Sequence, residues 1–193
     1  MAIGSETLTP NQAARRERVV DAALSLAAEG GYDAVQMRDV ATRAQVALGT
    51  IYRYFSSKDH LLAACQVELW REMADRFERR PPAGATAVER VTDVLHRAMR
   101  AVETEPRRTA ALITASASPD PAVRECQTEI MATMDAVLVA AMGDLDPELM
   151  ARIARTLRTV WFGWLAGWVN GWEDTATVAA EIESATDLLL EGR

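Results

Sequence analysis

The sequence is short of the residues that metal and disulfide sites need. Its 193 residues include two cysteines, Cys65 and Cys126, and two histidines, His60 and His96. The cysteines lie far apart and form no CxxC pair, so we expect reduced thiols in a cytoplasmic protein. Two histidines nearly exclude a multi-histidine metal site. We therefore expect no metal ion and no cofactor.

Long apolar runs are also missing. The longest strongly apolar stretch, residues 159–172, has 14 uncharged residues, whereas a membrane-spanning helix needs about 20. The first residues lack the basic and apolar regions of a signal peptide. We interpret residues 159–172 as a buried helix and expect no membrane partner.

The motifs that hydrolases and nucleotide-binding enzymes use do not occur. The sequence contains neither GxSxG nor GxxxxGK[ST], and His96 has no Ser or Cys partner in a recognisable arrangement. We find no candidate catalytic residue. The chain is therefore predicted not to be an enzyme.

No segment alternates with the period of two that strands require, and almost every segment has helical spacing. We predict an all-α fold of about nine helices, with a three-helix helix-turn-helix domain followed by a helical ligand-binding and dimerisation domain. The proposed domains span residues 1–60 and 61–193. Helices are expected to end at Gly30 and Gly31, and again before Pro81, Pro82 and Gly84.

The stretch VALGTIYRYFSSKDHLL, residues 46–62, places aromatic rings, a hydroxyl and cations close together in a chain of net charge −7. Residues 1–60 have no net charge, so the whole negative charge lies in residues 61–193. Local neutrality alone is a weak nucleic-acid signal. The positions of the cations carry more weight than their number.

Two short helices with a tight turn near Gln45 and Val46 indicate a helix-turn-helix. In the second helix, Ile51 and Phe55 are expected to face the core, while Thr50, Arg53 and Tyr54 face outward. Arginine suits phosphate or guanine edges, and tyrosine hydroxyls suit phosphate. The pattern therefore favours double-stranded DNA as a partner over a plain helical hairpin.

Residues 30–62 resemble the DNA-binding region of the TetR family of bacterial transcriptional repressors. The shared pattern is Gly after the first helix, Arg-x-Val-Ala in the second, and then Gly-Thr-Ile-Tyr-x-Tyr-Phe-x-x-Lys-x-x-Leu. Within the family, GGYDAVQMR, VALGTIYRYF and a loosely similar Trp-containing tail most resemble the KstR-type repressors of actinobacterial sterol catabolism.

The resemblance implies a homodimer with one helix-turn-helix per subunit and a C-terminal domain that senses a small-molecule effector. It also implies a set of DNA-contacting positions: Gln36, Met37, Arg38, Ala47, Leu48, Gly49, Thr50, Tyr52, Arg53, Tyr54 and Lys58. Two of these residues, Ala47 and Leu48, cannot form hydrogen bonds with bases, because their side chains have no hydrogen-bonding groups. Base reading is therefore expected to rest on Gln36, Arg38 and Arg53.

The C-terminal half is rich in apolar and flexible side chains. Four tryptophans between residues 161 and 172 form one helical stripe, which suits either an ordinary core or the wall of an effector cavity. Methionines can fill core gaps or adapt to a bulky ligand. We predict a large, mostly apolar effector, with a sterol-derived or fatty acyl thioester as the specific candidate. The predicted effector-binding residues are Met99, Leu112, Met131, Met134, Trp161 and Trp164.

Dimerisation is expected in the last two helices. One face of residues 175–191 carries Val178, Ile182, Ala185 and Leu189, and such a face is bare unless a partner covers it. The favoured function is a repressor that its effector releases from operator DNA. Two alternatives remain open: a small-molecule carrier with a vestigial helix-turn-helix, and a ligand-dependent activator.

Overall fold

The computed structural model describes residues 9–192. All regular secondary structure in that range is helical, which confirms the predicted fold class. The nine helices of the described range are α1 (Pro10–Ala34), α2 (Met37–Ala44), α3 (Leu48–Tyr52), α4 (Lys58–Arg79), α5 (Ala87–Thr104), α6 (Pro106–Ser116), α7 (Pro121–Met142), α8 (Pro147–Val169) and α9 (Thr175–Leu190).

Helix α1 begins and ends where its sequence requires. Thr9 and Gln12 form a capping box at its start, and Pro10 occupies the first turn, where a missing N–H costs nothing. The predicted stop at Gly30 and Gly31 is visible as non-helical backbone at both residues. Gly31 has φ 70°, a conformation that glycine adopts without a steric penalty.

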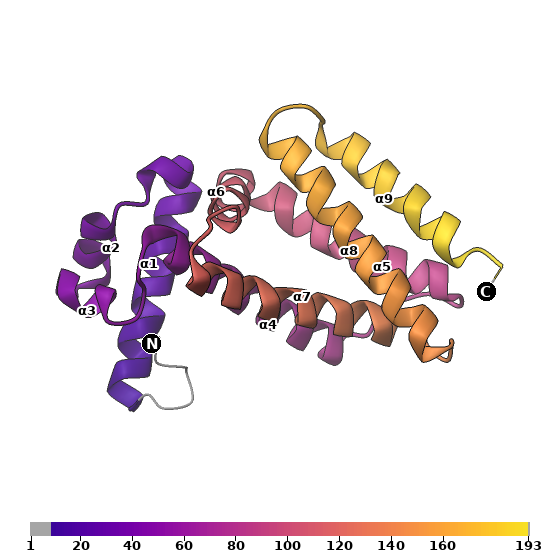
Figure 1. Ribbon diagram of the computed structural model, residues 1–193, viewed down its shortest axis with the longest axis horizontal. Helices are drawn as coiled ribbons and strands as arrows, with labels where there is room; N and C mark the ends of the chain where they lie inside the picture. Colours follow the sequence, from indigo (N-terminus) through magenta and orange to yellow (C-terminus); the bar gives the residue numbers. More distant parts are fainter. Residues whose placement is uncertain (1–8, 193) are drawn as a thin grey trace. The chain divides into compact units, whose positions relative to one another are not determined.

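The chain divides into two compact units. The first unit contains the described residues up to Glu68 together with residues 105–128, so it comprises α1, α2, α3, α6 and the first parts of α4 and α7. Helix α1 is its centre, because both α2 and α6 pack against it (Figure 1). Val19, Val40, Ile51 and Phe55 are buried in this unit and hold the short helices in place.

The second unit contains residues 69–104 and the described residues from 129 onward. It comprises α5, α8, α9 and the later parts of α4 and α7. Helix α9 packs against both α5 and α8, and Figure 1 shows α8 and α9 side by side. Val91, Leu157, Val178 and Leu190 are buried there. The domain boundary at residue 60 stays a prediction; α4 is one continuous helix from Lys58 to Arg79.

Candidate functional site

The turn between α2 and α3 sets the orientation of the helix-turn-helix. Helix α2 ends at Ala44, and Gln45 adopts a left-handed conformation with φ 54°, which reverses the chain without a glycine. The Val46 N–H donates to the Ala41 carbonyl at 3.0 Å. From α1, Arg18 Nε donates to the Ala44 carbonyl at 3.2 Å. These hydrogen bonds place the start of α3 relative to α1 and α2.

The helix-turn-helix exposes two cations and an aromatic ring to solvent. Ile51 and Phe55 are buried, as predicted, and Tyr52 is 53% exposed. Arg38 on α2 and Arg53 at the end of α3 are also exposed. Among the described residues, no hydrogen bond or ion pair engages either guanidinium group. Two unpaired arginines on successive helices form a surface suited to phosphate and base edges.

The other predicted DNA-contacting residues differ in how accessible they are. Gln36 is exposed, and its Nε2 donates to the Asp33 carbonyl at 2.9 Å. Tyr54 is only 8% exposed, so the expectation that its ring faces outward is wrong, because the ring packs with Phe55 in the core. Ala47 and Gly49 are exposed, whereas Met37, Leu48 and Thr50 are half-buried. Their contacts with DNA stay predictions.

Lys58, the first residue of α4, is held by α1. Its Nζ donates to the Tyr32 carbonyl at 3.2 Å. The Tyr32 hydroxyl in turn donates to Asp59 Oδ1 at 2.5 Å. This hydrogen bond to a carboxylate, together with burial, raises the pKa of Tyr32 to about 12. The end of α1 and the start of α4 are therefore joined by one polar cluster, which sequence reasoning did not find.

A second polar cluster surrounds the turn between α3 and α4. Asp120, in the α6–α7 loop, accepts hydrogen bonds from the hydroxyls of Ser56 and Ser57. His60 is buried, and its Nδ1 accepts from the Ser56 N–H at 3.1 Å. Burial lowers the pKa of His60. No spacing in the sequence links Asp120 to these serines, which lie 64 and 63 residues before it.

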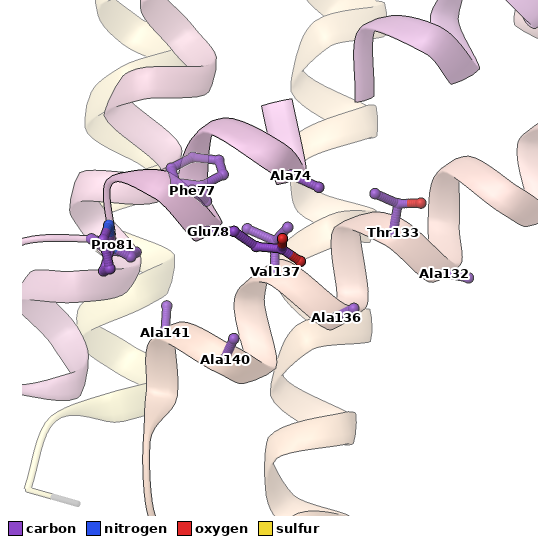
Figure 2. A pocket seen from close by; sticks show the side chains of 11 residues that line it. Ala74, Phe77, Glu78, Pro81, Ala132, Thr133, Ala136, Val137, Ala140 and Ala141 are labelled. Atoms are coloured by element: carbon purple, nitrogen blue, oxygen red, sulfur yellow. The ribbon is translucent and has the colours of Figure 1, made fainter. Parts of the chain in front are cut away.

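The second unit contains a pocket of about 610 Å³ between α4 and α7 (Figure 2). Helix α7 contributes alanines at every fourth position, which lie on one helix face and leave space where larger side chains would fill it. Helix α4 contributes Phe77 and Glu78, and Pro81 follows. The wall is mostly apolar, and the polar side chains that line it are Glu78 and Thr133.

The predicted effector-binding residues do not line this pocket. Met99, Met134 and Trp161 are buried in the second unit, and Leu112 is buried on α6 in the first unit. Trp164 is half-buried, and Met131 is exposed. The buried side chains pack in the cores of their units. Core packing was the alternative to an effector cavity for these tryptophans and methionines. The assignment of these six residues to an effector site stays a prediction.

The proposed dimer face of α9 is not bare. Val178 and Ile182 are buried in the chain itself, because α9 packs against α5 and α8, and the premise that only a partner would cover them is wrong. Ala185 and Leu189 are half-buried. A different set on α9 faces outward at spacings of four, and all of its members are exposed: Ala176, Ala180, Ser184 and Leu188. Trp172, in the loop before α9, is exposed as well.

Residues 9–192 contain neither a metal-binding cluster nor a membrane-spanning helix. No three histidine, cysteine, aspartate or glutamate side chains in that range are grouped so that they can hold a metal ion. No helix in the same range has the length and hydropathy needed to cross a membrane.

Comparison with known proteins agrees with this geometry. The model of "Bacterial regulatory proteins, tetR family" matches residues 19–65, and that of "Tetracyclin repressor-like, C-terminal domain" matches residues 84–189. The chain is 37% identical to the HTH-type transcriptional repressor KstR of Rhodococcus jostii over 190 residues, which cover 97% of this chain and 89% of that protein.

Solved structures show the same fold. A TetR transcriptional regulator from Rhodococcus sp. RHA1 has a TM-score of 0.84 and 32% identity, over 94% of this chain and 98% of the other. Thermus thermophilus FadR, crystallised with lauroyl-CoA, has a TM-score of 0.74 and 22% identity, over 92% and 94% of the two chains. The chain belongs to the TetR family of bacterial regulatory proteins.

Proposed function

We propose that this protein is a transcriptional repressor that binds operator DNA and is released by a small-molecule effector. The observation that carries the proposal is that Arg38, Tyr52 and Arg53 of the helix-turn-helix are all exposed, and that neither arginine forms an ion pair with another described residue. Exposed arginines read guanine edges or hold phosphates, and a tyrosine hydroxyl can hold a phosphate. The relatives named as transcriptional repressors support the same role.

We further propose that the repressor acts as a homodimer. One helix-turn-helix reads one half-site, and two half-sites about one helical turn apart require two copies at a fixed spacing. The outward face of α9 supports this assembly, because Leu188 on it is 81% exposed. Trp172, in the loop that precedes α9, is 75% exposed. Large apolar side chains grouped on one face are a common mark of an interaction surface.

The proposed effector is large and mostly apolar, and we suggest a sterol-derived or fatty acyl thioester. The pocket between α4 and α7 has a volume in the range of small-molecule sites, about 300–1,000 Å³, and an apolar wall. Glu78 disfavours an anionic group there, so the pocket suits the apolar body of such a ligand and not its phosphates. The lauroyl-CoA bound to the Thermus regulator is a ligand of this kind.

Release then follows from two states of one dimer. In one state the spacing of the two recognition helices matches the two half-sites, and in the other it does not. An effector that binds more tightly to the second state shifts the population toward it. Operator affinity falls because the two half-sites are no longer engaged together. By linkage, operator DNA lowers the affinity for the effector by the same factor.

A mobility-shift titration with DNA from upstream of the gene tests this function. We expect retardation at low salt, and release when lauroyl-CoA or a steroid acyl thioester is added. A folded protein that retards no DNA at low salt would favour the carrier alternative. An increase in operator affinity on adding the thioester would favour the activator alternative.

A further inference from the structure

Helices α4 and α7 are the two helices that begin in the first unit and continue into the second. Their first turns are joined by the side chain of Asp120, which immediately precedes α7. Asp120 Oδ2 accepts from Ser56 Oγ at 2.9 Å and from Ser57 Oγ at 3.0 Å. We call these two hydrogen bonds the Asp120 clamp.

The same side chains also cap both helices. Asp120 Oδ1 accepts from the Ala122 N–H at 2.9 Å, in the first turn of α7. Ser57 Oγ accepts from the His60 N–H at 3.0 Å, in the first turn of α4. The hydrogen bonds from the Ala122 N–H and from the two serines lower the pKa of Asp120, so it is ionised at neutral pH. One carboxylate therefore fixes the start of α4 to the start of α7.

The clamp lies directly beside the DNA-reading segment. Arg53 ends α3, Phe55 closes the turn that follows, and Ser56 is the next residue. The Phe55 N–H donates to the Ile51 carbonyl at 2.9 Å, so this turn is rigidly attached to α3. A displacement of Asp120 therefore acts on backbone that is continuous with the recognition helix.

The pocket is lined by the later parts of the same two helices. Polar contacts join α4 and α7 on the way: Gln127 Nε2 donates to Gln66 Oε1 at 3.3 Å in the first unit, and Arg71 Nε donates to Glu129 Oε1 at 2.7 Å in the second. Beyond them, Ala74 and Phe77 of α4 and Ala132 and Ala136 of α7 border the pocket. A ligand there contacts both α4 and α7.

We infer that Asp120 is a positioning residue that couples the effector pocket to the recognition helix through Ser56 and Ser57. The inference rests on the proposed repressor function. A ligand between α4 and α7 shifts one helix relative to the other, and the clamp transmits this shift to the turn after α3. Hydrogen-bonded networks of this kind can carry coupling between two sites that both bias the same element.

The test compares three quantities for the wild-type protein and its variants: operator affinity alone, operator affinity with saturating lauroyl-CoA, and lauroyl-CoA affinity without DNA. For Asp120→Ala and for Ser56→Ala with Ser57→Ala, we expect operator affinity alone and thioester affinity to stay within about threefold of wild type. The thioester should weaken wild-type operator binding by about tenfold or more, and that of the variants by less than about threefold.

Conservative variants separate coupling from loss of helix caps. Ser57→Thr retains a hydroxyl that caps α4 and donates to Asp120, so it should keep the wild-type response. Asp75→Asn removes an exposed carboxylate elsewhere on α4 and should also respond like wild type. Combining Asp120→Ala with the two serine changes should add nothing to the loss seen with either alone, because they remove the same contact.

Two outcomes overturn the inference. Variants that respond to lauroyl-CoA like wild type would show that the clamp does not transmit the signal. Folded variants that lose operator binding without any ligand would show that Asp120 only supports the DNA-binding unit. If the wild-type protein does not bind the operator, or binds it and is not released by the thioester, the proposed function itself fails, and this inference fails with it.

Discussion

The ammonium group of Lys58 lies 3.6 Å from the centre of the Tyr32 ring. Lys58 is the single lysine of the chain, and the resemblance to TetR repressors assigns it to DNA contact. A cation over an aromatic face gains about 0.5–1 kcal/mol at an exposed site. Tyr32 thus holds the ammonium group beside the helix-turn-helix before any DNA arrives, which limits the entropy lost when a phosphate is bound.

The first prediction concerns the charge of Lys58. Lys58→Met should weaken binding about equally for all DNA sequences, because a phosphate contact carries no sequence information. It should also reduce the slope of log affinity against log salt by about 0.9, the value for one phosphate contact. Filter binding from low to high salt measures both effects. Arg100→Gln, at an exposed position of α5, is the control. An unchanged slope for Lys58→Met would exclude the phosphate contact.

The second prediction separates two neighbouring residues of the recognition segment. Arg53→Ala should cost about 1–3 kcal/mol of operator binding with no change in thermal stability, because Arg53 is exposed and unpaired. Tyr54→Ala should instead lower the free energy of unfolding by about 3 kcal/mol or more, because Tyr54 is buried. Thermal unfolding and operator titration of both variants distinguish them. Wild-type operator affinity in Arg53→Ala would contradict the assignment of this surface.

The helix bounds were predictable because local chemistry sets them. Proline and glycine interrupt the chain at fixed positions: the stop expected at Gly30 and Gly31 is seen in α1, and α4 ends at Arg79, just before Pro81 and Pro82. Which side of a helix is covered depends on distant segments. Tyr54 and Tyr52 are two residues apart in one short segment, yet one is buried and the other exposed, and only packing decides this.

The polar clusters were not predictable for the same reason. Asp120 is 64 residues from Ser56 in the sequence, and no spacing rule links them. The α9 face was assigned from its periodicity alone, which shows that a helix has an apolar side but not what covers it. Helices α5 and α8 cover Val178 and Ile182, whereas Trp172 was counted as part of a buried stripe and is exposed.

The third prediction concerns pH and His60. The neutral, buried imidazole accepts a hydrogen bond from the Ser56 N–H. Burial lowers the pKa of His60 below the ordinary 6.5. The charges of Asp120 and Glu125 raise this pKa, and the charge of Arg16 lowers it further. The unfolded chain therefore takes up a proton at a higher pH than the folded chain. Stability is fully present above pH 6.5 and is lost as the pH falls toward the folded pKa.

The measurement is the urea midpoint between about pH 7.5 and about pH 5.5, a window above the ordinary pKa values of carboxylates. The wild-type midpoint should fall as the pH falls, and His60→Gln, which cannot titrate, should show a smaller fall. Equal falls in the two proteins would exclude His60 as the titrating group.

The fourth prediction concerns the pocket between α4 and α7. Ala136→Leu places a larger side chain in the pocket from an exposed position of α7, and leucine is well tolerated in helices. Lauroyl-CoA affinity should fall by about tenfold or more, the effect of losing about 1.4 kcal/mol of binding, with operator affinity unchanged. Thr128→Leu places the same leucine side chain at an exposed position of α7 outside the pocket and should bind like wild type. Unchanged affinity in Ala136→Leu would place the ligand elsewhere.

The last prediction separates the two faces of α9. Leu188→Arg adds a charge to the exposed stripe, and we expect a folded monomer by sedimentation, with operator binding lost because one copy engages one half-site. Ile182→Ala removes a buried side chain and should lower the free energy of unfolding by about 2–5 kcal/mol. Glu103→Arg introduces an arginine at an exposed position of α5, away from this face, and should remain dimeric. A dimer that persists in Leu188→Arg would place the interface away from this stripe, because a desolvated arginine without a partner cannot be accommodated in an apolar contact.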